Sequence, residues 1–151
     1  MLRRERRGRN FQMVSVVIDT NVLVSAALKW DSVPGSIIDL ALNGLIVPFV
    51  NNEILREYEM VLRRPKFHLT DDIVSDIVKE FRRCAVYLDA EHLDLDLPDP
   101  KDLVFYELTM EVRKNKEAKL VTGNIKHFPA KPFVLTPRQF LNFILEESNE
   151  T

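Results

Sequence analysis

The stretch VSVVIDTN, at residues 14–21, decides the fold class of this chain. Its first part, Val14–Ile18, is a largely β-branched run of the kind that forms a strand buried on both faces of a sheet. Asp19 follows this run directly, and residues 20–29 have a helical pattern. The stretch therefore predicts a buried strand of a parallel sheet, with an acidic residue at its carboxyl end.

The rest of the chain alternates short apolar runs with amphipathic segments. The apolar runs predict strands, and the segments bounded by capping residues, prolines and glycines predict helices. This alternation implies one α/β domain, in which a central parallel sheet of about four or five strands lies between layers of helices. Further strands are expected at residues 46–50, 85–88, 119–121 and 133–135. Further helices are expected from Pro34 to Gly44, from Asn51 or Asn52 to about Arg64, from Thr70 or Asp71 onward with Ile73, Ile77, Val78 and Phe81 buried, from about Asp99 to Lys114, and after Thr136.

Length and composition predict one domain with a short basic extension. The chain has 151 residues, of which 46% are hydrophobic, and this is enough for a core of its own. Residues 1–12 carry five arginines and one glutamate, whereas the remainder has 16 basic and 22 acidic residues. We therefore expect a basic extension at 1–12, a domain at 13–147 and a tail at 148–151. The acidic body argues against a broad phosphate-binding surface, but it allows a nuclease whose acidic site binds cations.

Several function classes lack the residues that they need. Cys84 is the only cysteine, which excludes an internal disulfide and a thiolate-rich metal site. His68, His92 and His127 are not spaced as zinc ligands, and the sequence has neither a glycine-rich phosphate loop nor a G-x-S-x-G nucleophile motif. No apolar run approaches the roughly 20 residues of a membrane span, and the basic start lacks the apolar stretch of a secretory signal. We expect a cytoplasmic protein without a membrane segment.

Two acidic residues stand where a functional and a structural role compete. Asp19 suits either a metal site or a turn or helix cap. Glu57 lies at the edge of the apolar helix face that includes Ile54 and Val61. A carboxylate on a packed face needs a cationic partner, because desolvation of its charge is costly. That partner is either a basic side chain or a metal ion.

Further polar residues begin the helix near Asp99 and follow the strand at 119–121. Asp99 and Asp102 suit the first turn of a helix, where an acid also has a capping role. Asn124 follows a glycine directly after the strand and offers an amide oxygen. Each of these residues is a weak signal when it is taken singly.

Taken together, the acidic residues predict one metal site. Ligands of parallel α/β folds collect beyond the carboxyl ends of the strands. We therefore expect Asp19, Glu57 and Asp102 to be the catalytic residues and to share divalent cations. Mg²⁺ and Mn²⁺ both prefer such oxygen ligands. A pair of these ions could activate a water molecule and stabilise the leaving oxygen of a phosphodiester.

Three segments of the sequence resemble the PIN-domain family. They are IDTNVLVSAAL at residues 18–28, ILREYEMVLRRPKF at 54–67, and LPDPKDLVFYELTMEVRKNKEAKLVTGNIKHFP at 97–129. The resemblance implies a parallel sheet between helices and a divalent-metal-dependent ribonuclease activity. The TGN motif and the residues after it are similar to a toxin-like branch of the family, which resembles the toxin half of VapBC-type toxin–antitoxin pairs and commonly forms dimers.

The resemblance also implies roles for individual residues. Asp19, Glu57 and Asp102 match the family's acidic residues. The family often has aspartate where this chain has Asn124, and the loss of that charge is expected to weaken cation binding. The supporting residues that the resemblance implies, as neighbours of the acids or as hydrogen-bonding partners, are Asn21, Asp99, Thr122 and Asn124.

Two functions remain open from the sequence. The first is a Mg²⁺- or Mn²⁺-dependent endoribonuclease that acts on RNA, with an antitoxin protein as a possible partner and a homodimer as the expected assembly. The second is a PIN-fold module that binds RNA or a protein without cleavage. A site closed by an arginine or lysine salt bridge would favour the second function, and acids gathered around one cavity would favour the first.

Overall fold

The structure is a computed structural model that describes residues 13–149, so the extension predicted at residues 1–12 lies outside the described residues. Its centre is a single sheet of five strands. The strands are β1 (Ser15–Ile18), β2 (Val47–Val50), β3 (Val86–Tyr87), β4 (Ala118–Val121) and β5 (Val134–Leu135). All neighbours pair in parallel in the order β3-β2-β1-β4-β5, which places β1 in the middle.

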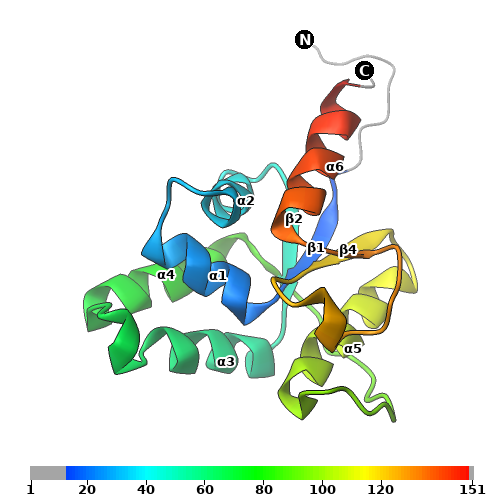
Figure 1. The fold of residues 1–151 in the computed structure, drawn as a ribbon, viewed down its shortest axis with the longest axis horizontal. Helices are drawn as coiled ribbons and strands as arrows, with labels where there is room; N and C mark the ends of the chain where they lie inside the picture. Colours follow the sequence, from blue (N-terminus) through cyan, green and yellow to red (C-terminus); the bar gives the residue numbers. More distant parts are fainter. Residues whose placement is uncertain (1–12, 150–151) are drawn as a thin grey trace.

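Helices cover both faces of this sheet (Figure 1). They are α1 (Thr20–Leu28), α2 (Val33–Leu42), α3 (Asn52–Leu62), α4 (Asp71–Cys84), α5 (Leu103–Arg113) and α6 (Pro137–Asn149), with the short 3₁₀ turns η1 (Pro65–Phe67), η2 (Pro100–Asp102) and η3 (Ile125–His127). α1 to α4 pack together on one face, where α6 contacts α2, and α5 covers β1 and β4 from the other. The predicted three-layer α/β domain is confirmed, although α6 continues beyond the domain end expected at residue 147.

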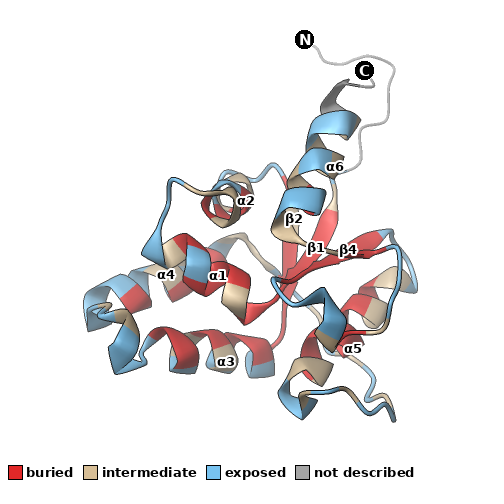
Figure 2. Cartoon of the chain, viewed as in Figure 1, coloured by how far each residue is buried: buried red, intermediate tan, exposed pale blue. Residues whose placement is uncertain are grey.

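β1 is buried on both faces, as its sequence predicts. Val16, Val17 and Ile18 have no exposed surface, and β4 beside them is buried along its whole length. Figure 2 shows that buried residues concentrate on the strands and on the helix faces that meet them. Within residues 13–149, no helix combines the length and the apolar character that a membrane crossing requires.

The buried face of α4 differs from the prediction. Val74, Val78 and Phe81 are buried, whereas Ile73, which was expected in the core, is 45% exposed. The buried residues recur at spacings of four and three, which places them on one side of the helix. Ile73 precedes the first of them by one position and is therefore turned away from the core by about 100°.

The segment before α5 also differs from the prediction. The helix expected from Asp99 to Lys114 begins as the 3₁₀ turn η2, because the Asp102 N–H bonds to the Asp99 carbonyl three residues earlier. The loop that precedes it has no regular structure. Glu107 of α5, a buried acid, accepts the Leu93 N–H of this loop at 2.7 Å and so fastens the loop to the helix.

Tyr58 ties α3 to the end of the central strand. Its hydroxyl donates a hydrogen bond to the carbonyl of Ile18, 40 residues earlier in the chain. Its ring is fully buried and meets the edge of Phe81, with 5.3 Å between the ring centroids. A buried tyrosine normally needs such a partner for its hydroxyl. The bond therefore sets the position of α3, and of Glu57 beside Tyr58, relative to the carboxyl end of β1.

We predict that Tyr58→Phe lowers the free energy of unfolding by about 1–3 kcal/mol, because the buried carbonyl of Ile18 loses its donor. Tyr87→Phe is the matched control, since Tyr87 is 46% exposed on the edge strand β3. Urea denaturation of both variants measures the difference. Equal stability of the two variants would show that the Tyr58 hydroxyl does not stabilise the fold.

Candidate metal centre

Asp19 lies where β1 ends and α1 begins. Its backbone N–H donates to the carbonyl of Val121 at the end of β4, at 2.9 Å, which extends the pairing of the two strands. Asp19 occupies the N-cap position of α1, but its side chain makes no capping hydrogen bond. The residue is only 4% exposed. Its carboxylate is therefore buried at the carboxyl edge of the sheet.

Two side chains hold the Asp19 carboxylate in place. The Thr122 hydroxyl, 103 residues away in the chain, donates to Asp19 Oδ2 at 2.7 Å, and the Asn21 amide donates to the same oxygen at 3.3 Å. Asn21 Oδ1 in turn accepts the N–H of Gly123 at 3.0 Å. The structure thus brings together Asp19, Asn21 and Thr122, three of the residues singled out in the sequence. Because both donors reach one oxygen, the orientation of the carboxylate is fixed.

The other two acids act on Asp19 electrostatically. Burial raises the pKa of Asp19 from its ordinary 3.8 to about 6, and the hydrogen bond from Thr122 opposes this rise. The negative charges of Asp102 and Glu57 add to it. Among residues 13–149, His127 is the one basic side chain that contacts any of the three acids, through Asp102.

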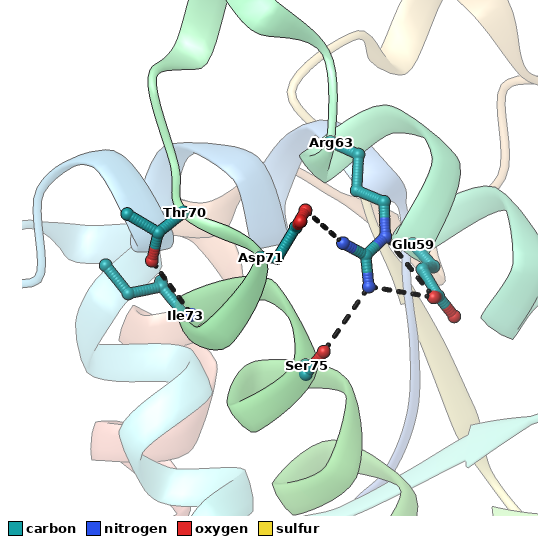
Figure 3. Close-up of polar contacts among 6 residues, drawn as sticks. All are labelled: Glu59, Arg63, Thr70, Asp71, Ile73 and Ser75. Atoms are coloured by element: carbon teal, nitrogen blue, oxygen red, sulfur yellow. Dashed lines mark hydrogen bonds and ion pairs between the residues drawn. The ribbon is translucent and has the colours of Figure 1, made fainter.

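Glu57 contributes from α3, where it is half-buried between the buried residues Ile54 and Tyr58. Its neighbour Glu59 has a different role. Glu59 and Asp71 both bind Arg63, at 3.1 and 2.7 Å, and this network joins α3 to α4 on the surface (Figure 3). Among residues 13–149, no lysine or arginine forms an ion pair with any of the three candidate acids.

Asp102 contributes from the start of α5. Burial and the charge of Asp99 raise its pKa, whereas a contact with His127 lowers it. The imidazole Nδ1 of His127 lies 3.2 Å from Asp102 Oδ2. Asp99 itself caps η2, where its side chain accepts the N–H of Lys101 at 3.0 Å. Sequence reasoning missed the pair of His127 and Asp102, and the one available signal was that His127 closely follows the TGN motif.

Asn124 is exposed, and its contact with the site runs through its backbone. Its N–H donates to the Thr122 hydroxyl at 3.0 Å, which completes a chain of hydrogen bonds from Asn124 through Thr122 to Asp19. Its side-chain amide makes no hydrogen bond to any residue in the described part of the chain. The structure therefore places this residue beside the site without showing its amide oxygen turned to the acids.

The donor set fits a hard divalent cation that keeps part of its water. Within residues 13–149, no three acidic, histidine or cysteine side chains converge closely enough to hold one ion by themselves. Mg²⁺ usually binds one or two carboxylates and retains several water molecules, so it does not need such a group. The buried hydroxyl of Thr20, next to Asp19, has no hydrogen-bond partner in the described structure, and a water molecule could satisfy it.

The raised pKa of Asp19 predicts a pH-dependent stability of the metal-free protein. A carboxyl whose pKa is higher in the folded state stabilises the fold below about pH 4, and this contribution is lost as the pH rises through about 6. Asp19→Asn should therefore raise the unfolding free energy relative to the wild type by about 3 kcal/mol above pH 7 and by little at pH 4.

Urea denaturation in the presence of a chelator, from pH 4 to 8, measures this difference. Asp76→Asn, which replaces an exposed acid on α4, is the control and should show no such trend. A loss of stability in Asp19→Asn at every pH would instead support the structural role of Asp19 in a turn or cap.

The comparisons with known proteins identify the family. The sequence profile of the PIN domain matches residues 15–126, a range that includes Asp19, Glu57 and Asp102. The chain is also similar to an uncharacterized protein of Methanocaldococcus jannaschii, with 40% identity over 53 residues. That match covers 35% of this chain and 34% of the relative, so the chain spans about a third of the protein that it matches. The chain belongs to the PIN domain family, whose members are generally nucleases that use divalent metals.

Proposed function

We propose that this protein is a Mg²⁺- or Mn²⁺-dependent endoribonuclease that hydrolyses RNA phosphodiester bonds. The observation that carries this proposal is the state of Asp19. Its buried carboxyl group has a pKa raised to about 6, partly by the charges of Asp102 and Glu57, and none of the three acids has a lysine or arginine partner among the described residues. A divalent cation would compensate the negative charge of these acids.

The acids of the site would bind the cation, and their hydrogen-bond donors would orient them. Asp19, together with Glu57, Asp102 or both, would hold a cation that keeps part of its water. The cation would supply Lewis acidity for the attack of water on a phosphodiester. Thr122 and Asn21 keep the Asp19 carboxylate in one orientation, so that it does not have to reorganise during the reaction. Burial of Asp19 excludes bulk water and strengthens its attraction for a cation.

The biological setting is a separate part of the proposal. We infer that the protein is a toxin-type PIN protein, that it acts as a homodimer in the cytoplasm, and that an antitoxin protein controls it. This rests on the resemblance of the TGN motif at residues 122–124, and of the residues after it, to the toxin-like branch. Co-purification with a protein encoded next to this chain, and its release when RNA cleavage begins, would test this inference.

A second candidate is a PIN-fold module that binds RNA or a protein without cleavage. Asn124 favours it, because an amide stands where the family often has an acid. The absence of a ready three-ligand group within the described residues also favours it. The two candidates differ in metal-dependent RNA cleavage. The binding module would bind RNA or a protein without a metal ion and would leave the RNA intact.

We predict that Asp19→Asn, Glu57→Gln and Asp102→Asn each lower Mn²⁺-dependent cleavage of a mixed RNA panel by about 100-fold or more, which corresponds to about 2.7 kcal/mol of transition-state stabilisation. Glu53→Gln is the matched control, because Glu53 is an exposed acid on the same helix as Glu57. Gel analysis of end-labelled RNA measures the rate. RNA binding without cleavage by the wild type at any Mn²⁺ or Mg²⁺ concentration would favour the binding module.

We further predict that Asn124→Asp tightens Mn²⁺ binding several-fold, because it adds a negative charge beside the cation site. Asn115→Asp is the control, since Asn115 is exposed and precedes β4 at the opposite edge of the sheet. Titration calorimetry on the metal-free protein compares the two. An unchanged affinity in Asn124→Asp would place residue 124 outside the reach of the ion.

A further inference from the structure

We propose that His127 is a positioning residue of the metal centre, whose imidazole Nδ1–H holds the Asp102 carboxylate in the orientation that lets Asp102 share a cation with Asp19. This inference rests on the proposed function, because it concerns the same site. It adds to that site a residue that is neither a ligand of the cation nor one of the family's matched acids. The contact that carries it is the separation of 3.2 Å between His127 Nδ1 and Asp102 Oδ2.

The chemistry of the pair fixes the direction of the hydrogen bond. An ionised carboxylate can only accept, so Nδ1 of His127 must carry the proton and donate it. Asp102 is the N-cap residue of α5, yet its side chain makes no capping hydrogen bond to that helix. In the described part of the chain, His127 is its only polar side-chain partner. The imidazole therefore restrains one oxygen of Asp102 and leaves the other to a cation.

The position of His127 in the chain links the two acids. The segment from Thr122 to His127 contacts both acids. Its first residue, Thr122, donates its hydroxyl to Asp19 at 2.7 Å, and its last residue, His127, contacts Asp102. Backbone hydrogen bonds fix this segment, since the His127 N–H donates to the Asn124 carbonyl at 3.0 Å. One short segment thus sets the arrangement of two carboxylates that come from different strands and helices.

An imidazole suits this role better than a basic side chain would. It can donate the hydrogen bond without a positive charge, whereas lysine or arginine would always bring a charge that competes with the cation for Asp102. The side chain of Asp102 is only 16% exposed, so its orientation is also restrained by packing. The side chain of His127 is 43% exposed, which makes its contribution to the core small. Its effect on the site can therefore be separated from its effect on stability.

The test measures Mn²⁺ binding to the metal-free full chain, by electron paramagnetic resonance of free Mn²⁺, together with the melting temperature. We expect His127→Ala to lower the affinity by about 10–100-fold, the usual effect of the loss of a residue that orients a metal ligand. His127→Asn should restore most of it, because its amide nitrogen can occupy the place of Nδ1. His127→Gln extends one bond further and should not restore it.

His92→Ala is the matched control. His92 also pairs with an acid, with its Nδ1 2.6 Å from Glu107, but neither residue belongs to the site. This variant should bind Mn²⁺ as the wild type does. If His127→Ala also lowers the melting temperature, the Mn²⁺ affinities of His127→Asn and His127→Gln are compared instead. Both variants keep a polar side chain of similar size, so a difference between them reports the hydrogen bond and not the stability of the fold.

The outcomes separate the inference from the proposed function. Equal Mn²⁺ affinity and cleavage in the wild type and His127→Ala would overturn the role of His127 and leave the ribonuclease in place. The role of His127 would also be overturned if His127→Asn lost as much Mn²⁺ affinity as His127→Ala. A donor at the place of Nδ1 would then not restore cation binding. A wild type that neither binds Mn²⁺ nor cleaves RNA would overturn both.

Discussion

The burial of one carboxylate, that of Asp19, is the constraint on which the rest of this structure depends. An ionised acid with almost no exposure is costly unless hydrogen bonds and a cation compensate for lost hydration. Thr122 and Asn21 provide the hydrogen bonds, and both reach the same oxygen. No described basic residue provides the positive charge, and the nearby Asp102 and Glu57 increase the need for it. Among the described residues, the Asp19 carboxylate has hydrogen bonds but no paired lysine or arginine.

The parallel sheet explains how residues far apart in sequence meet at this point. β1 and β4 are neighbours and run in the same direction, so the residues that follow them, Asp19 and Thr122, emerge at the same edge. α3 is attached to that edge by the hydrogen bond from Tyr58 to Ile18, and Glu57 stands one residue before Tyr58 on this helix. The turn after β4 then returns to the start of α5 through His127 and Asp102. The fold thus brings Asp19 together with Thr122, and Asp102 together with His127.

Sequence reasoning reached the fold class and most elements, because period-two and period-3.6 patterns and capping residues are local signals. It also singled out the contact partners Asp19, from its place at a strand end, and Thr122, from the resemblance to the family. On α4 it assigned Ile73 to the buried face in place of Val74, since only packing distinguishes two adjacent apolar residues. It could not foresee the pair of His127 and Asp102 or the role of Glu107. These contacts depend on how a loop folds back in space, and no local pattern encodes that.

The central claim is that Asp19, Glu57 and Asp102 share a divalent cation, and anomalous diffraction tests it most directly. Crystals of the wild type soaked in Mn²⁺ would be measured at the manganese absorption edge, with Asp19→Asn crystals treated in the same way. The account predicts an anomalous peak in the wild type within coordination distance of Asp19 and at least one of the other two acids, and a strongly reduced peak in the variant. A wild-type map without a peak among these acids, at Mn²⁺ concentrations that saturate other oxygen sites, would contradict it.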